Sequence, residues 1–135
     1  MLFRIFIGLH VAVFRFTNGK ILSYISGMPI LLLSTRGRKS GKTRTTPVTY
    51  IRDGENYVIT ASNNGRDNHP AWFYNLQAES QAGLELPGKK LQVTATVATQ
   101  AERERLWPEL VKQAPFFDRY QKSTDRIIPM VVLKP

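Results

Sequence analysis

The sequence contains no cysteine, and it has only two histidines among its 135 residues. Without cysteine the chain cannot build a disulfide framework, a thiolate metal site or a cysteine nucleophile. His10 and His69 lie too far apart in the sequence to form a metal-site signature, so we expect no bound metal. The absence of cysteine also fits a reducing compartment, and we expect a cytoplasmic protein.

Acidic residues are absent from the first 52 positions. This segment carries nine Lys and Arg residues, whereas residues 53–135 carry ten basic and ten acidic ones, so the net charge of +9 lies entirely in the first 52 residues. Five of the nine form one cluster, which consists of Arg36, Arg38, Lys39, Lys42 and Arg44. Because no nearby carboxylate can neutralise it, this cluster favours the binding of an anion.

The sequence also lacks a membrane-spanning apolar run. At the N-terminus, Ile5–Phe14 is apolar except for His10, but a spanning helix needs about 20 apolar residues. The residues that follow offer no small-residue cleavage site, which argues against a signal peptide.

We predict that this apolar run forms a helix that ends at Asn18-Gly19. Residues 1–18 would then be an appendage to a single domain that covers residues 1–135. Two placements of the helix remain open on the sequence. It is either buried against its own domain or a partner subunit, or residues 1–17 make peripheral contact with the inner face of a membrane.

From residue 28 onward, short β-rich runs alternate with turns. Asp53-Gly54 and Pro87–Lys90 predict hairpin connections, and since hairpins join most strands the fold class is α+β, an antiparallel sheet closed into a small barrel with helices outside. The predicted strands cover residues 30–33, 45–51, 57–61, 84–86, 91–97 and 127–133, the helices residues 71–78, 99–111 and 116–122, and the polar loops residues 35–44 and 63–68.

The basic cluster lies in a segment, Gly37–Thr43, that resembles a phosphate-binding loop of nucleoside triphosphatases. That reading fails because only three residues separate Gly37 from Gly41, where the motif needs four, and because β-branched residues rather than a helix follow. The physical basis for anion binding remains, since glycines let backbone N–H groups converge and cations attract phosphate or carboxylate. The charge is concentrated in one loop, so a compact anionic cofactor fits better than a nucleic acid.

Four segments carry a resemblance to a known family. They are Gly37-Arg38-Lys39-Ser40-Gly41-Lys42-x-Arg44-x-Thr46-Pro47, Ala61-Ser62, His69-Pro70-Ala71-Trp72-Phe73-Tyr74-Asn75-Leu76 and Tyr120-Gln121-x-x-Thr124-x-Arg126-x-Ile128-Pro129. With these motifs in order, the sequence resembles the deazaflavin-dependent nitroreductase family of split-barrel oxidoreductases, which use coenzyme F420. The resemblance runs from about Met28 to Leu133 and implies a six-stranded antiparallel split β-barrel, FMN-binding-like, with flanking helices.

The resemblance also implies which residues bind the cofactor. Coenzyme F420 carries a phosphate and a polyglutamate tail, which the basic loop would hold. Thr46 and Pro47 would lie at the loop exit, and Ala61 and Ser62 would face the deazaflavin ring with backbone N–H groups. Trp72 would lie beside the cofactor or serve as a core anchor. The implied cofactor-binding residues are Arg38, Lys39, Ser40, Lys42, Arg44, Thr46, Pro47, Ala61, Ser62, Trp72 and Asn75.

A deazaflavin transfers a hydride, so the implied activity is reduction of a small conjugated or nitro-aromatic acceptor, namely a nitro compound, a quinone or an enone. Ser62 and Tyr120 are the candidate catalytic residues, because a hydroxyl can supply the accompanying proton. Phe117 stands where nitroreducing members tend to carry tyrosine, and a ring without a hydroxyl cannot donate a proton. This departure counts against nitroimidazole reduction.

Two other functions remain open on the residues. The same cradle would serve an FMN- or FAD-binding reductase of the same fold. A non-catalytic cofactor carrier or a nucleic-acid-binding module would also use its positive charge. Because split barrels often pair across an open face, analogy further suggests a homodimer.

Overall fold

The computed structural model describes residues 2–17, 19, 24–25 and 27–135. Asn18, part of the predicted helix stop, lies outside the described residues. The helices are α1 (Leu2–Phe16), α2 (Ala71–Ala78), α3 (Gln100–Gln113) and α4 (Phe116–Lys122), with a short 3-10 turn η1 (Asn63–Gly65). The strands are β1 (Tyr24–Ile25), β2 (Met28–Arg36), β3 (Thr43–Asp53), β4 (Asn56–Thr60), β5 (Gln81–Leu86), β6 (Lys89–Val97) and β7 (Met130–Lys134).

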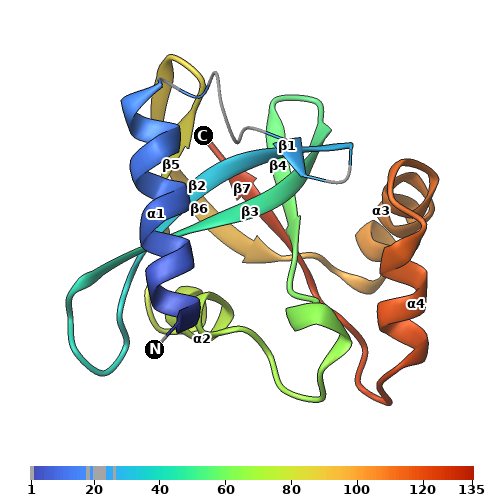
Figure 1. Ribbon diagram of the computed structural model, residues 1–135. Coiled ribbons are helices and arrows are strands. Elements are labelled where there is room, and N and C mark those ends of the chain that lie inside the picture. The colour runs from blue at the N-terminus through green and yellow to red at the C-terminus, as the bar shows by residue number, and fades with distance from the viewer. Residues whose placement is uncertain (1, 18, 20–23, 26) are drawn as a thin grey trace.

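Strands β2 to β7 close an antiparallel barrel, which occupies the centre of Figure 1. Their order is β2-β3-β4-β7-β6-β5, and β5 returns to pair with β2, for example through Leu33 and Leu84. The short strand β1 adds to β2. The predicted six-stranded antiparallel split barrel with flanking helices is therefore confirmed.

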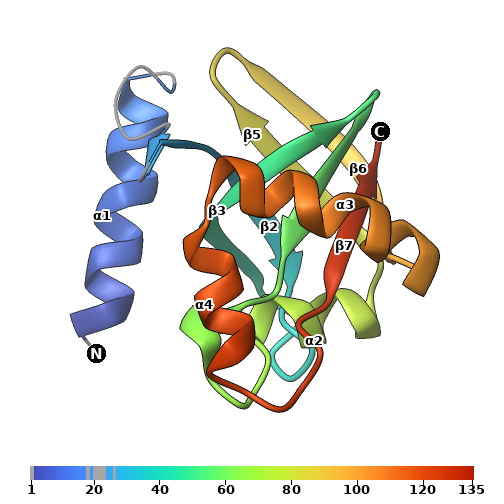
Figure 2. The ribbon, with the colours of Figure 1, turned by 90° about the vertical axis from the view of Figure 1, so that its right-hand side faces the viewer.

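Strand alternation divides the core between the inside and the outside of the barrel. Inward-facing residues such as Leu31 and Leu33 pack with residues of every other barrel strand and with α2. Outward-facing residues such as Val58 pack beneath Leu110 of α3 and Phe117 of α4. Figure 2 shows α3 and α4 against one side of the barrel and α1 beside another. The capping box of Thr99 and Glu102 begins α3, as its sequence predicts.

The N-terminal helix α1 docks on the barrel through one face. Val11 and Phe14 are buried, and they pack on Leu32 of β2. Arg15 near its C-terminal end donates to Glu85 of β5 at 2.6 Å. The opposite face remains open to solvent, since Phe16 is 92% exposed. No described helix is long and apolar enough to cross a membrane.

The hairpin of β2 and β3 is longer than the sequence analysis predicts. Residues 35–44 were expected to form a loop, but Arg36 pairs with Thr43, so the loop contains only residues 37–42. The Ser34 and Thr45 hydroxyls hydrogen-bond at 2.8 Å across the two strands. Threonine is β-branched and favours strands, which explains the extension. Two of the five clustered cations therefore lie on strand ends rather than in the loop.

The last strand begins later than predicted. It was expected from Ile127, but β7 starts at Met130 because side chains bind the preceding backbone. Gln121 donates to Arg126 O at 2.7 Å and accepts from Ile128 N–H at 2.9 Å. Arg103 donates to Ile128 O at 2.9 Å. These bonds satisfy the backbone without a strand partner.

Two turns also differ in detail from the predictions. The β5–β6 turn contains only Pro87 and Gly88, since Leu86 pairs with Lys89. Pro70 precedes α2 as its N-cap, with an extended ψ of 154°, rather than occupying the first helical position.

Candidate cofactor site

The basic loop, residues 37–42, folds tightly on its own backbone. Gly37 N–H donates to Lys42 O at 2.8 Å, and Gly41 N–H donates to Gly37 O at 2.8 Å. The Ser40 hydroxyl accepts from Lys42 N–H at 3.2 Å. A Cβ on Gly37 would lie 2.7 Å from the Ser40 Oγ, so a larger residue there would displace the Ser40 side chain. Ser40 therefore shapes the loop as well as offering a hydroxyl.

Asn75 of α2 ties the loop to the body of the protein. Its side chain is 7% exposed. The amide oxygen accepts from Arg38 N–H at 3.1 Å, and the amide nitrogen donates to the Thr35 hydroxyl at 3.0 Å. Asn75 was expected to lie beside the cofactor; in the structure both ends of its amide bond to the protein, which leaves one donor and one acceptor site of the amide. These bonds join the basic loop and the end of β2 to α2.

The five clustered cations carry unneutralised charge. All are exposed, and within the part of the chain that the structure describes none of them pairs with a carboxylate. The Arg38 guanidinium lies 4.7 Å from the centroid of the Tyr74 ring, a cation–π contact that directs this side chain toward α2. This donor set fits a ligand with several negative groups, such as a phosphate with a carboxylate tail.

Thr46 and Pro47 do not lie at the loop exit, because β3 already begins at Thr43. Thr46 pairs with Leu33, so it shares the face that turns to the barrel interior. Pro47 pairs with Leu32, so it shares the face on which α1 packs. Adjacent residues of a strand point to opposite faces, and one ligand cannot contact both side chains from the same side.

The end of β4 presents fewer free backbone groups than expected. Ala61 is fully buried, and its N–H donates to Pro129 O at 2.9 Å. Ser62 is half-buried and has no recorded partner for its N–H within the described residues. Of the two N–H groups expected to face the ring, only that of Ser62 is available.

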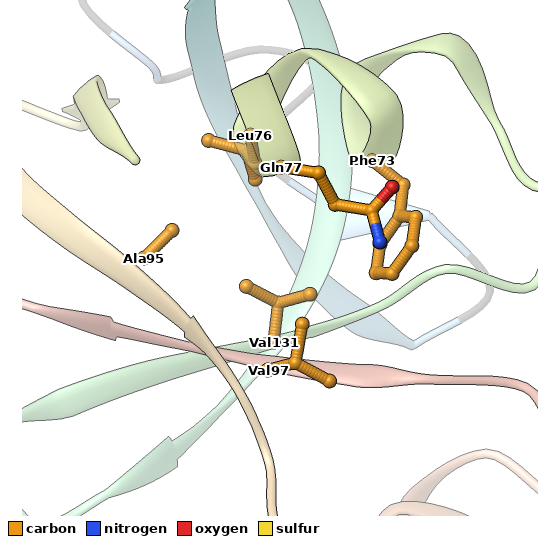
Figure 3. A pocket seen from close by; sticks show the side chains of 6 residues that line it. All are labelled: Phe73, Leu76, Gln77, Ala95, Val97 and Val131. Atoms are coloured by element: carbon orange, nitrogen blue, oxygen red, sulfur yellow. The ribbon is translucent and has the colours of Figure 1, made fainter. Parts of the chain in front are cut away.

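Helix α2 lies between the basic loop and the end of β4, and all three gather at one end of the barrel, at the bottom of Figure 1. Trp72 is partly buried against the inner core and lies edge-on to Phe73 at 6.4 Å. This packing supports the core-anchor role. Beneath α2 there is an apolar hollow of about 30 Å³, shown in Figure 3 and lined by Phe73, Leu76, Gln77, Ala95, Val97 and Val131. It has room for about two water molecules and cannot hold a deazaflavin ring.

Tyr120 and Ser62 lie on neighbouring elements. Residue Tyr120 of α4 packs its backbone against Gly65 of η1, and Ser123 donates to Gly65 O at 2.8 Å. The Tyr120 ring lies edge-on to Phe117 at 5.8 Å. Phe117 itself is 4% exposed within the outer core, so its ring serves packing. A tyrosine hydroxyl at that position would be buried.

His69 and Arg126, to which the sequence pattern gives no role, lie at the end of β4. His69 precedes α2, and its ring lies 4.5 Å from that of Phe73. The Arg126 Nη1 lies 3.0 Å from His69 Nδ1. Because a guanidinium only donates, Nδ1 must accept, and the ring proton of neutral His69 lies on Nε2. Both residues belong to the motifs that carry the family resemblance, and this membership was the only sequence feature that marked them as candidate site residues.

We expect His69 to make the protein less stable in acid. Burial and the neighbouring Arg126 charge lower the pKa of His69 below its ordinary 6.5. The unfolded chain therefore binds this proton more readily, and stability falls as pH decreases below about 6.5 toward the folded pKa. His69→Asn keeps an acceptor for Arg126 without titrating, so its Tm should fall less than that of the wild type between pH 7.5 and 5. Equal losses in both proteins would contradict this prediction.

Comparisons with known proteins agree with this geometry. The sequence model of the F420H(2)-dependent quinone reductase family matches residues 6–135. An F420H(2)-dependent quinone reductase of Mycobacterium tuberculosis is 41% identical over 130 residues, which cover 93% of this chain and 87% of that protein. A solved F420-H2 dependent reductase, FDR-A, has a TM-score of 0.72 at 34% identity and covers 78% of this chain and 94% of its own. A structure described as a domain-swapped dimer has a TM-score of 0.74 at 30% identity, covering 93% and 96%.

A split barrel whose carboxylate-free basic loop and β4 end meet across α2 suits an anionic, flavin-type cofactor. The chain belongs to the F420H(2)-dependent quinone reductase family, whose cofactor is coenzyme F420. The resemblance to deazaflavin-dependent split-barrel reductases is thereby confirmed.

Proposed function

We propose that this protein reduces a quinone with coenzyme F420. The observation that carries the proposal is the basic loop, whose exposed cations have no carboxylate partner in the described residues and whose backbone is fixed by Asn75. The relatives that match are, by name, quinone reductases. Nitro-aromatic compounds and enones are the alternative acceptors.

We assign a proposed role to each group of residues at this end of the barrel. Arg38, Lys39, Lys42 and Arg44 hold the phosphate and glutamate tail of F420 through charge-assisted bonds. When bound, the reduced cofactor supplies a hydride. The hydroxyls of Ser62 and Tyr120 are the proposed proton donors to the acceptor oxygen.

A parallel titration of the pure protein with F420, FMN and FAD tests the cofactor, and turnover with a quinone, a nitro-aromatic compound and an enone tests the acceptor. We expect saturable binding of F420 and fastest turnover with the quinone. Tight FMN or FAD binding without F420 binding would overturn the proposal. Oligonucleotide binding that falls steeply with salt, without redox turnover, would instead support a nucleic-acid-binding module.

We also propose that the protein is a homodimer, because a structurally similar protein is described as a domain-swapped dimer. Light scattering coupled to size exclusion measures the mass directly. A monomeric mass at micromolar concentration would contradict the proposal.

The outer face of α1 supports a further proposal, peripheral contact with the inner face of the cytoplasmic membrane. Leu9 and Phe16 are exposed by 59% and 92% on this face. Because burial of each side chain in lipid is worth about 1.5–3 kcal/mol, Leu9→Ser with Phe16→Ser should weaken binding to anionic vesicles at least about tenfold. The matched control replaces the exposed Val97 and Ile127 by serine. Equal vesicle binding by both double variants would contradict membrane contact through α1.

A further inference from the structure

Arg126 lies between α4 and β7, and its guanidinium group gathers four acceptors around the end of β4. Nη2 donates to Ala61 O at 3.1 Å and to Ser62 O at 2.8 Å. Nε donates to Arg66 O at 2.9 Å, and Nη1 bonds to His69 Nδ1 at 3.0 Å. A planar group with donors on several sides is suited to hold such a loop in one conformation.

The charge of Arg126 is not cancelled by these contacts. All four acceptors are neutral, and no carboxylate of the described chain forms an ion pair with Arg126. The nearby Asp67 carboxylate accepts from the Thr124 hydroxyl at 2.8 Å, and its charge acts on Arg126 without an ion pair. The guanidinium therefore bonds directly only to neutral acceptors, and the Asp67 charge offsets it from a distance.

The bond to Ala61 O has a geometric consequence for Ser62. The carbonyl of Ala61 and the N–H of Ser62 belong to one trans peptide group, so they point in opposite directions. Because the carbonyl points to Arg126, the Ser62 N–H points away from it. The guanidinium polarises this peptide group and makes its N–H a stronger donor. This is the same N–H that has no recorded partner within the described chain.

The loop after Ser62 keeps an unfavourable backbone. Asn63 and Asn64 have φ values of +48° and +57°, in the left-handed region that glycine prefers. The Asn63 amide bonds to Asn68 O at 3.0 Å, which helps to hold this shape. A strained backbone persists only where surrounding contacts enforce it, and such places are enriched at functional sites.

We propose that Arg126 is a positioning residue that holds the Ala61–Ser62 peptide so that the Ser62 N–H is a fixed, polarised donor to the deazaflavin ring. Arg126 acts through the peptide and does not touch the ring. The inference rests on the proposed function, because it requires F420 to bind at this end of the barrel.

Two variants test the inference through cofactor binding. Arg126→Gln removes the polarising clamp, and Ser62→Pro removes the N–H itself at a position whose φ of −74° suits proline. Oxidised and reduced F420 are titrated separately by absorbance and fluorescence. Since a donor stabilises charge on a reduced ring, both variants should bind the reduced form about tenfold more weakly and the oxidised form less so. The ratio of the two Kd values, and so the potential of the bound cofactor, then shifts.

Three matched variants show which group causes a shift in the Kd ratio. Ser62→Ala removes the hydroxyl but keeps the N–H, so a shift seen only in Ser62→Pro belongs to the N–H. Arg103→Gln removes a guanidinium that binds Ile128 O but makes no recorded bond to the end of β4, and its Kd ratio should match the wild type. Arg126→Lys keeps the charge but cannot reach all four acceptors, so it should remain impaired.

The outcomes separate this inference from the proposed function. If the wild type binds no F420, the proposed function fails. If the wild type binds F420 and the Kd ratio is unchanged in Arg126→Gln and Ser62→Pro, only the positioning role fails. Full recovery in Arg126→Lys, or an equal shift in Arg103→Gln, would also overturn it. Should circular dichroism show that Arg126→Gln does not fold, the Kd ratio of Arg126→Lys decides the role of Arg126, and that of Ser62→Pro decides the role of the N–H.

Discussion

Replacing Lys39 and Lys42 together by alanine is expected to weaken F420 binding by about 30-fold. Both lysines are exposed in the basic loop, so each contact with the cofactor is screened by water and is worth about 1 kcal/mol. Their combined loss of about 2 kcal/mol corresponds to this change in Kd. Because the interaction is electrostatic, the difference between variant and wild type should shrink as ionic strength rises.

The matched control is the double variant Lys89→Ala with Lys90→Ala. It lowers the net charge equally, but these lysines lie beside the β5–β6 turn, at the end of the barrel opposite the basic loop in Figure 1. Its Kd should stay within about twofold of the wild type, since separated exposed charges are screened. An equal loss of affinity in both double variants would mean that the net charge of the protein attracts the cofactor. The basic loop would then not be a specific binding site.

Phe14→Ala is expected to destabilise the protein by about 3–5 kcal/mol, the usual cost of removing a buried phenyl ring. Phe14 is 2% exposed and packs on Leu32 of the barrel. In a chain of this size the change should lower the Tm by about 10 °C or more. Thermal unfolding followed by circular dichroism measures it. The predicted status of residues 1–18 as an appendage to one domain is tested by the same experiment.

Phe16→Ala is the control, because it is the same chemical change on the same helix at a residue that is 92% exposed. Its Tm should differ little from that of the wild type. If Phe14→Ala is equally mild, α1 contributes little to the core and is a true appendage. A large loss confined to Phe14→Ala would make the helix part of the folding unit.

Local patterns predicted the helices and the barrel class well. The range of α2 agrees at both ends, and the capping box of Thr99 marks the start of α3, because helix signals lie within a few residues of each other. The glycine of the Asp53-Gly54 turn has a φ of +62°, as its hairpin requires. Strand ends were less predictable, since cross-strand pairing decides where β2 ends.

The sequence predicted which residues belong to the candidate site, but not which of them contact one another. The basic loop was evident from its charge, whereas the bonds of Asn75 to Thr35 and Arg38 join segments that are about 40 residues apart. Arg52, which had no assigned role, donates to Gly54 O at 3.1 Å and lies over the Tyr57 ring. The partners of Arg126 span residues 61–69. Only the closed barrel brings such groups together.

Helix α2 connects the two parts of the candidate site, the end of β4 and the basic loop. His69, just before the helix, bonds to Arg126 at the end of β4, and Asn75, within the helix, holds Arg38 of the basic loop. The helical residues between these two contacts, 71–75, rise by about 6 Å at 1.5 Å per residue, so α2 fixes the distance between the end of β4 and the basic loop. Inserting one residue between Ala71 and Asn75 would turn Asn75 by about 100° and break its bond to Arg38.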